Sequence, residues 1–283
     1  MNVSRFANSG IAELIASTLE TALKKPTWRL SVKQRKANVC FWQACCSVVR
    51  LGSGLSILSL QYGEARMEQF HETMAGATVT RMPVGPLLTN CYLVQSGTEL
   101  MLVDPGMVWN RELEEVATVV ESANAHLRWI VCTHGHFDHV SGVDTAMKRF
   151  PDATLLMNPR EAELARDPMA NYAAQMGSTF AMQAASSPLI AGQELPLGLI
   201  TYRIATIQGH TPASSILIAG DHAFVGDTLF AGSVGRTPSQ EEFEQLLAGI
   251  RVTLMTLPPA TRIFPGHGNP TTVGAELGEN PWV

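Results

Sequence analysis

The sequence has few cysteines, and none stands in a spacing typical of disulfide frameworks or thiolate metal sites. The 283 residues contain five, at Cys40, Cys45, Cys46, Cys91 and Cys132, and no C-x-x-C pair occurs. This excludes a small disulfide-stabilised secreted scaffold, because such proteins carry cysteines densely. The pattern is typical of proteins in a reducing compartment, and we predict a cytoplasmic location.

Lysine is nearly absent from the larger part of the chain. Residues 1–66 hold nine Lys or Arg and three Glu, a formal charge of +6, whereas the remainder carries −11 and a single lysine, Lys148. A nuclease or another nucleic-acid-binding protein needs a basic surface that attracts the phosphate backbone. We therefore expect no nucleic-acid partner for the acidic part of the chain.

Long apolar runs are also missing. The most apolar stretch, residues 40–60, is interrupted by Arg50, which leaves runs much shorter than the roughly 20 residues of a transmembrane helix. We expect no membrane partner. Residues 1–66 are interpreted as a basic, disordered N-terminal extension. It is either a leader, such as an organellar transit peptide, or a consequence of a start codon assigned upstream of Met67 or Met74.

From Thr78 onward, short apolar runs alternate with helical patterns and turn residues. Strands are predicted at residues 77–84, 90–95, 99–104, 127–133, 153–158, 199–207, 214–220, 222–227 and 261–266. Helices are predicted at residues 111–123, 143–149, 159 to about 183, and about 240–255. This order predicts a layered α/β domain at residues 67–283, with functional side chains on loops at strand ends.

The segment THGHFDH, residues 133–139, holds three of the chain's eight histidines and follows a predicted strand. In extended backbone, the spacing of His134 and His136 directs both imidazoles to one side, where they can bind one metal ion. Asp138 and His139 follow after a change of register. We therefore expect these two side chains to face a second ion.

Three later strand ends carry further candidate ligands beside glycines: His210 in QGHTPASS, Asp227 in VGDTLFAGSVGR and His267 in FPGHGNP. A single histidine after a strand is more often a solvated loop residue than a ligand. Seven His and Asp side chains at four strand ends, with no competing cysteine, instead predict two sites of three or four ligands each. Such sites leave a position for water, which is typical of catalytic metals.

THGHFDH resembles the H-x-H-x-D-H signature of the metallo-β-lactamase fold. The phrases GHTP, GDTLFAGSVGR and PGHG are similar to those of the glyoxalase II (hydroxyacylglutathione hydrolase) branch, in particular its small members without a C-terminal helical domain. The resemblance covers about residues 78–283. It implies an α/β fold in which two sheets lie between helical layers (αββα), with a dinuclear metal site at one edge of the paired sheets.

The resemblance also implies a role for each of the seven side chains. The first ion is assigned to His134, His136 and His210, the second to Asp138, His139 and His267, and Asp227 is the bridging ligand. Asp138 and Asp227 are also the predicted catalytic residues. The cofactors are expected to be two divalent metal ions, most simply Zn²⁺, with iron or manganese as alternatives because all three accept these ligands.

This ligand set predicts a hydrolase. Two ions lower the pKa of a shared water from about 15.7 toward neutrality, and the metal-bound hydroxide attacks a carbonyl whose oxyanion the ions stabilise. A thiolate, with a pKa of about 8.5, leaves without a dedicated general acid, and no G-x-S-x-G serine elbow is present. We expect cleavage of a small-molecule thioester similar to S-D-lactoylglutathione, while the oligomeric state stays open.

Alternatives of the same fold remain. A persulfide (sulfur) dioxygenase would bind one iron through His134, His210 and Asp227. A lactonase would present an ester carbonyl to the same hydroxide. A non-catalytic metal-binding protein would be favoured if any of the seven ligands were missing, and none is.

The chain departs from its relatives at Ala213 and Pro238, neither of which is a candidate ligand. Only 16 residues follow His267. The basic glutathione contacts that a C-terminal helical domain supplies in larger glyoxalase II enzymes are therefore not expected.

A few other residues have competing explanations. A turn alone accounts for Asp104 in its Asp-Pro-Gly context, although the resemblance implies an aspartate that orients a ligand from beneath the metal site. We predict that Asp221 and His222 form a hairpin turn and that Cys132 belongs to the core. Trp109, Tyr172 and the Met-rich segment 169–182 could line a pocket, but ordinary packing explains such residues equally well.

Overall fold

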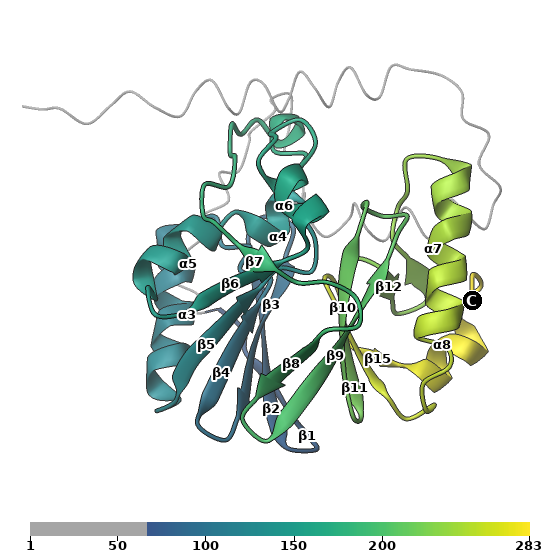
Figure 1. Ribbon diagram of the computed structural model, residues 1–283, viewed down its shortest axis with the longest axis horizontal. Coiled ribbons are helices and arrows are strands. Elements are labelled where there is room, and N and C mark those ends of the chain that lie inside the picture. Colours follow the sequence, from purple (N-terminus) through teal and green to yellow (C-terminus); the bar gives the residue numbers. More distant parts are fainter. Residues whose placement is uncertain (1–66) are drawn as a thin grey trace, which may run out of the picture. The chain divides into compact units, whose positions relative to one another are not determined.

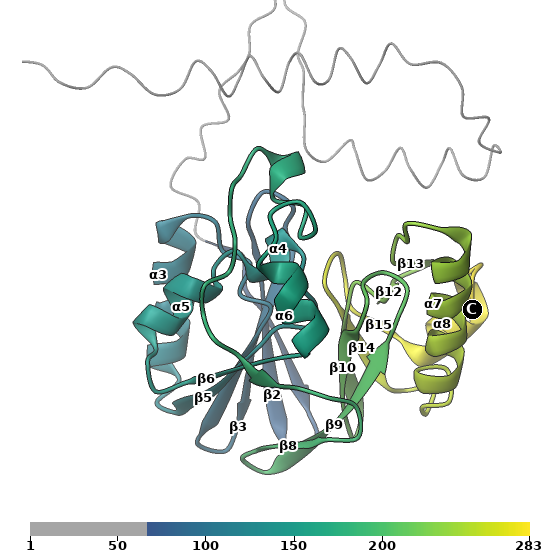
Figure 2. The ribbon, with the colours of Figure 1, turned by 45° about the horizontal axis from the view of Figure 1, so that its top comes forward.

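The computed structural model describes residues 67–283, and the predictions for residues 1–66 lie outside this range. Within the described residues, two β-sheets face each other and helices cover the outer face of each, as Figures 1 and 2 show. The predicted αββα sandwich is confirmed. No helix in this part of the chain combines the length and the apolar character needed to cross a bilayer.

The first sheet follows the order of the sequence, β1-β2-β3-β4-β5-β6-β7. Strands β1 to β4 are antiparallel, whereas β4 to β7 are parallel and need crossover connections. The strands are β1 (Phe70–Met74), β2 (Ala77–Val84), β3 (Thr89–Ser96), β4 (Glu99–Val103), β5 (His126–Val131), β6 (Thr154–Met157) and β7 (Ser187–Pro188). The crossovers contain the helices α3 (Asn110–Ser122), α4 (Phe137–Val140), α5 (Val143–Arg149) and α6 (Pro159–Ala165), followed by the short 3₁₀ helix η1 (Ala174–Met176).

The second sheet has the order β15-β14-β11-β10-β9-β8. Its strands are β8 (Glu194–Leu197), β9 (Ile200–Ile207), β10 (Ser214–Ala219), β11 (His222–Gly226), β14 (Arg262–Pro265) and β15 (Thr271–Thr272). A small hairpin, β12 (Leu229–Phe230) and β13 (Ser233–Val234), follows β11. Helix α7 (Gln240–Thr253) connects the parallel strands β11 and β14, and α8 (Val273–Glu279) follows β15.

Successive side chains of the central strands pack into two different hydrophobic cores, one beneath the helices and one between the sheets. In β3, Cys91 and Leu93 pack into the core beneath α3 and α5, whereas Tyr92 and Val94 pack between the two sheets. Successive side chains of a strand point to opposite faces, so a strand that is buried on both faces contributes to two cores. In the second sheet, Leu217 packs against the first sheet, while its neighbours on β10 pack beneath α7.

The two sheets are joined at the edge where β5, β11 and β14 end. The Tyr92 hydroxyl donates a hydrogen bond to the Pro265 carbonyl (2.6 Å). The Asn90 amide donates to the Gly266 carbonyl (2.7 Å), and the Ser215 amide donates to the Thr133 carbonyl (2.7 Å). These bonds bring the loops that follow the strands of both sheets together at one edge.

At the opposite edge, the hairpin turn between β10 and β11 contacts the first sheet. Asp221 lies in its turn, whereas His222, which we predicted to be in the turn, is the buried first residue of β11. His222 Nε2 lies 2.7 Å from the Tyr202 hydroxyl, and His222 Nδ1 lies 2.9 Å from Asp221 Oδ1. Asp221 Oδ2 also accepts a hydrogen bond from the Ala75 amide of the first sheet (2.9 Å).

The helix predicted from residue 159 to about 183 is wrong beyond Ala165, where α6 ends. The buried Asn171 side chain donates to the carbonyls of Ala165 and Phe180 and accepts from the Ala173 amide. These bonds compete with those of a continuous helix, as polar side chains commonly do. Pro168 also breaks the pattern. The short elements β1, β7, β8, β12, β13, β15, α4 and α8 were not predicted, whereas the remaining strands and α-helices were.

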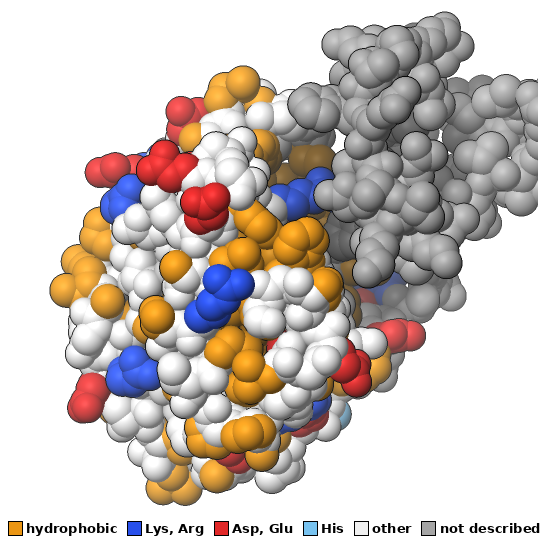
Figure 3. Space-filling model, turned by 90° about the vertical axis from the view of Figure 1, so that its right-hand side faces the viewer, with side chains coloured by type: hydrophobic (Ala, Val, Ile, Leu, Met, Phe, Trp, Pro, Cys, Tyr) orange, Lys and Arg blue, Asp and Glu red, His pale blue; other side chains and the backbone are white. Residues whose placement is uncertain are grey.

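Basic side chains do not gather on the face formed by α7 and α8. Figure 3 views this side of the molecule, and its Lys and Arg side chains are separated from one another by apolar and uncharged surface. The absence of a nucleic-acid partner stays a prediction, because only one face is visible in this view.

Candidate metal centre

The seven candidate ligands lie just beyond the carboxyl ends of strands. His134 and His136 follow β5, and Asp138 and His139 lie in the single turn of α4 rather than in extended backbone. The other three follow strands of the second sheet, with His210 after β9, Asp227 directly after β11 and His267 after β14. The joined edge of the two sheets therefore collects all seven.

Three imidazoles form a first group. One ring nitrogen from each of His134, His136 and His210 lies within 4.8 Å of the others. The ring centroids are 4.8 Å apart for His134 and His136, 5.0 Å for His134 and His210, and 4.6 Å for His136 and His210. Histidine nitrogens grouped in this way can hold one divalent ion.

Asp138, His139 and His267 form a second group within the same distance limit. His267 Nε2 lies 3.1 Å from Asp138 Oδ2, and His139 Nε2 lies 3.5 Å from the same oxygen. The Thr89 hydroxyl donates a hydrogen bond to Asp138 Oδ2 (2.9 Å) and holds the carboxylate in place.

Asp227 lies between the two groups. Its Oδ2 is 3.7 Å from His210 Nε2 of the first group and 3.5 Å from His267 Nε2 of the second. Its Oδ1 is 3.4 Å from His139 Nε2. A carboxylate in this position can contact two ions at once.

Four buried atoms around Asp227 have no hydrogen-bond partner among the described residues: His134 Nε2, His139 Nε2, His210 Nε2 and Asp227 Oδ1. An unsatisfied buried polar atom costs about 1–3 kcal/mol, so four of them at one place call for a bound group. Imidazole nitrogens and a carboxylate oxygen are the ligands that divalent metals prefer. The residues present therefore fit the metal ions that the sequence predicts.

The second ring nitrogen of several histidines is already engaged. His210 Nδ1 lies 2.8 Å from the Arg236 carbonyl, and His267 Nδ1 lies 3.2 Å from the Leu87 carbonyl. An Nδ1 that donates to a carbonyl leaves the Nε2 lone pair free for a metal. These contacts orient both rings toward the centre of the site.

Asp104 acts in the same way on His139. It is buried with a φ of 51°, an uncommon conformation for a residue other than glycine. Its carboxylate accepts hydrogen bonds from the amide and the hydroxyl of Thr133 (both 2.7 Å), and Oδ2 lies 2.9 Å from His139 Nδ1. A turn alone does not account for these contacts, so Asp104 supports a candidate ligand.

Burial and charge divide the site electrostatically. Burial lowers the pKa of His134, and it lowers the pKa of His136 to about 3, so both rings are neutral at physiological pH. For His139, burial also lowers the pKa, but the carboxylates of Asp138, Asp227 and Asp104 outweigh it and the pKa is raised. The acidic groups thus create a site that attracts positive charge beside neutral imidazoles that can bind metal.

Glycine allows two segments to pack against the ligands. A Cβ on Gly266 would lie 2.2 Å from Asp227 Oδ1 and 2.6 Å from His139 Cε1. A Cβ on Gly235 would lie 2.0 Å from the Asp227 carbonyl. Gly266 and Gly235 therefore lie so close to the ligand residues that a larger side chain at either position would clash with them.

Other residues weighed from the sequence take different positions. The Tyr172 ring lies 4.8 Å from the His136 ring and is 47% exposed, so Tyr172 forms part of the rim. Met182 and Cys132 are buried in the core. Trp109 is partly exposed and precedes α3.

The sequence did not identify Thr89, which donates a hydrogen bond to Asp138, or Glu161, which accepts hydrogen bonds from the loops that follow β5 and β9. Thr89 begins a strand, and Glu161 lies in the first turn of α6, where a carboxylate usually faces solvent. Neither has a motif that would distinguish it from an ordinary surface residue.

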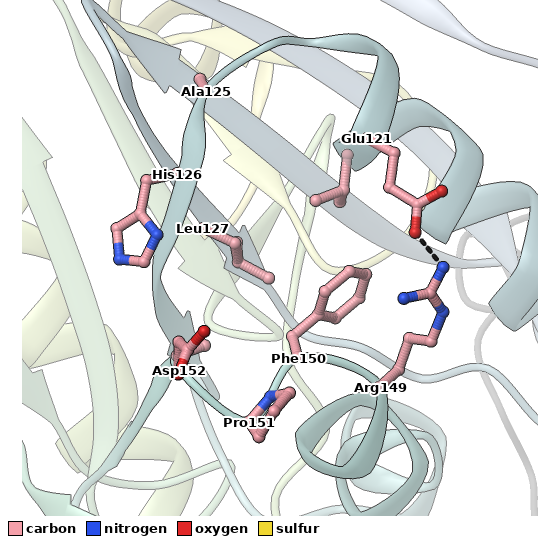
Figure 4. Close-up of a pocket in the computed structure, with 10 residues that line it drawn as sticks. Glu121, Ala125, His126, Leu127, Arg149, Phe150, Pro151 and Asp152 are labelled. Carbon is pink, nitrogen blue, oxygen red and sulfur yellow. Dashed lines mark hydrogen bonds and ion pairs between the residues drawn. The ribbon is translucent and has the colours of Figure 1, made fainter.

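A surface pocket lies away from this site, at the amino ends of β5 and β6 (Figure 4). Glu121 on α3 and Arg149 on α5 form an ion pair beside it. None of its lining residues belongs to the groups of converging His and Asp side chains found in residues 67–283. The pocket therefore has no part in the candidate centre.

Residues 84–267 match the family described as the metallo-beta-lactamase superfamily. The probable metallo-hydrolase YqgX of Bacillus subtilis (strain 168) is 30% identical over 207 residues, which cover 72% of this chain and 96% of the relative. The hydroxyacylglutathione hydrolase GloC of Haemophilus influenzae is 30% identical over 216 residues, 71% of this chain and 96% of the relative. Among solved structures, TTHA1623 in a di-iron-bound form has a TM-score of 0.62 and 31% identity, over 72% of this chain and 99% of that one.

Proposed function

We propose that this chain, which belongs to the metallo-beta-lactamase superfamily of metal-dependent hydrolases, cleaves a thioester similar to S-D-lactoylglutathione. The reaction would take place at a dinuclear metal centre. The observation that carries the proposal is the set of four unpartnered buried atoms around Asp227, placed between two groups of ligand-type side chains. The name of GloC, a hydroxyacylglutathione hydrolase, supports the thioester as the bond that is cleaved.

The ligand roles follow the two groups. His134, His136 and His210 are assigned to the first ion, and Asp138, His139 and His267 to the second. Asp227 is assigned to both, because its oxygens face a histidine of each group. Zn²⁺ is our proposal for the metal, and iron is the main alternative since a related structure contains two irons.

Bound divalent ions supply an activated water and polarise the carbonyl of the substrate. The chain's own residues then do the positioning. Asp138 and Asp227 are the carboxylates that can take up the proton released when water becomes a nucleophile. The Thr89 hydroxyl holds Asp138 by a hydrogen bond, and Gly266 lies directly against Asp227. A departing thiolate needs no proton from the protein because its pKa is about 8.5.

The rim of the site can contact the organic part of a small substrate. Tyr172 packs against His136, while Leu87 and Phe230 lie beside His267. Tyr172 and Leu87 are exposed, so their apolar surface is available to an acyl group or a thiol. We propose that the substrate binds against these side chains.

Residues 67–283 are proposed as the catalytic domain, since the family match lies within them. A cytoplasmic location is also part of the proposal, and it rests on the cysteine content of the sequence.

The test combines elemental analysis of the purified full-length protein with an assay of S-D-lactoylglutathione hydrolysis. We expect close to two ions per chain and thioester cleavage. Asp227→Asn should lose at least one ion and most of the activity, whereas Asp152→Asn, an exposed carboxylate beside the distant pocket, should retain both.

Other outcomes identify the alternatives. One iron per chain, with oxygen consumed on glutathione persulfide and no thioester turnover, would make the protein a dioxygenase and refute the hydrolase. Two ions with cleavage of lactones but not of thioesters would instead make it a lactonase.

A further inference from the structure

Glu161 is a fully buried carboxylate in the first turn of α6, with 0% of its surface exposed. Its Oε2 accepts a hydrogen bond from the Gly135 amide (2.9 Å), and its Oε1 accepts one from the Ala213 amide (2.6 Å). The two donors lie 26 residues before and 52 residues after it in the chain. One side chain thus joins a loop of the first sheet to a loop of the second.

Burial of the Glu161 side chain disfavours the charged form of its carboxyl group. Burial raises its pKa, although the hydrogen bonds from Gly135, Thr211 and Ala213 act in the opposite direction. No Lys, Arg or His of residues 67–283 forms an ion pair with it. Burying a carboxylate without an ion-pair partner destabilises a fold unless hydrogen bonds compensate. The amides of Gly135 and Ala213, which belong to two different loops, supply that compensation here.

The two loops carry the first group of ligands. Gly135 lies between His134 and His136, and Ala213 lies three residues after His210. We propose that Glu161 is a positioning residue for the first metal ion, because it ties the His134–His136 loop to the loop of His210 and so sets the spacing of the three imidazoles. This inference rests on the proposed function, which assigns these histidines to one ion.

The packing around Gly135 supports this role. A Cβ on Gly135 would lie 2.5 Å from the Glu161 carbonyl oxygen and 3.0 Å from the Ala165 amide nitrogen. The loop backbone therefore lies directly against α6, and the Glu161 carboxylate accepts a hydrogen bond from the Gly135 amide. A loop pressed against a helix in this way has little freedom to move without losing the bond.

The second group is held by different contacts. Asp138 is fixed by the Thr89 hydroxyl, His139 by Asp104, and His267 by the Leu87 carbonyl. None of these contacts involves Glu161. Loss of the Glu161 bonds should therefore weaken the first site and leave the second unchanged.

The experiment measures zinc affinity rather than turnover. Competition with a chromophoric chelator is first carried out on the full-length protein and on His267→Ala, which lacks a ligand of the second ion and isolates the first site. Glu161→Gln is then added to His267→Ala. The amide keeps the shape of the side chain but can accept only one of the two backbone hydrogen bonds.

We expect the first-site zinc affinity to fall about 10- to 100-fold, the usual effect of removing a contact that orients a metal ligand. The second site is measured in the same way in His136→Ala, where Glu161→Gln should change the affinity by less than about 3-fold. Cobalt substitution should also show an altered visible absorption spectrum for the first site alone.

Glu276→Gln is the matched control. Glu276 is also buried, at 3% exposure, and accepts hydrogen bonds from the Gly232 amide and the Thr271 hydroxyl, but it contacts neither ligand loop. Its substitution should lower the unfolding midpoint without changing either zinc affinity. The comparison separates a general effect of a buried amide from an effect on the ligands.

The outcomes are distinct. Equal first-site affinities with Glu and Gln at position 161 would overturn the inference and leave the dinuclear hydrolase intact. Fewer than two zinc sites in the unaltered protein would refute the proposed function itself. If Glu161→Gln does not fold, Glu161→Asp replaces it, and a folded Glu161→Asp protein with unchanged first-site affinity would overturn the inference as well.

Discussion

Replacing Gly266 with alanine places a methyl group between two of the proposed ligands. The new Cβ would lie 2.2 Å from Asp227 Oδ1 and 2.6 Å from His139 Cε1. Ordinary contact between non-bonded heavy atoms needs about 3.5 Å, so one or both side chains must move by roughly 1 Å.

The backbone cannot easily absorb this displacement. The Gly266 amide donates to the Gly226 carbonyl (2.8 Å), and the Gly266 carbonyl accepts from the Asn90 amide (2.7 Å). Gly266 is thereby held to both sheets. The strain should therefore be relieved by Asp227 and His139, which move away from the metal positions.

We expect two measurable effects of Gly266→Ala. Overpacking at a buried site costs about 1–3 kcal/mol of stability, which urea denaturation in the presence of a chelator would measure. A displacement of about 1 Å at a catalytic group costs on the order of 10²-fold in rate, so kcat/KM for thioester hydrolysis should fall by that factor and the zinc content should decrease.

Gly278→Ala is the control. Gly278 lies in α8 with nothing within 4 Å of the added Cβ, and alanine is favoured over glycine in a helix by up to about 1 kcal/mol. Its activity should be unchanged and its stability unchanged or higher. A Gly266→Ala protein with full zinc content, full activity and unmoved Asp227 and His139 in a crystal structure would refute the argument.

Two further substitutions test contacts away from the ligands themselves. Asp104→Asn leaves at least one hydrogen-bond donor of Thr133 or His139 without an acceptor. The free energy of unfolding, measured by urea denaturation, should drop by about 1–3 kcal/mol. Zinc affinity, measured by chelator competition, should fall about 10- to 100-fold, and an unchanged affinity would contradict this role of Asp104. Burial lowers the pKa of His222, although the nearby Asp221 carboxylate acts in the opposite direction. Below about pH 6.5 the unfolded chain therefore binds a proton at this histidine that the folded chain does not bind. The free energy of unfolding should fall as the pH decreases through this range. His222→Gln should reduce the loss of stability between pH 7.5 and pH 5.5 in urea denaturation, and an identical loss in both proteins would contradict this explanation.

Local patterns were sufficient to predict most of the fold. The short apolar runs of β3 and β5, bounded by turn residues, identified strands, because such a pattern depends only on neighbouring residues. The helix from residue 159 failed for a tertiary reason. Its continuation is replaced by hydrogen bonds of the buried Asn171 side chain, and burial of a single polar residue leaves no local signal.

The candidate site was predicted in part. The residue types and the spacing in THGHFDH indicated metal ligands. The change of register predicted before Asp138 and His139 is the single turn of α4, which the sequence did not identify as a helix. Both side chains nevertheless converge with His267. Whether these groups bind metal stays a prediction.

The sequence by itself determined which side chains could form a metal centre and which strands would carry them, because ligand chemistry and strand periodicity are local properties. Only the tertiary structure decided how those ligands are held. Thr89, Asp104 and Glu161 contact residues 26 to 52 positions away, and all three are buried in the folded chain. A hydrogen bond between distant segments depends on packing, which no spacing along the chain encodes.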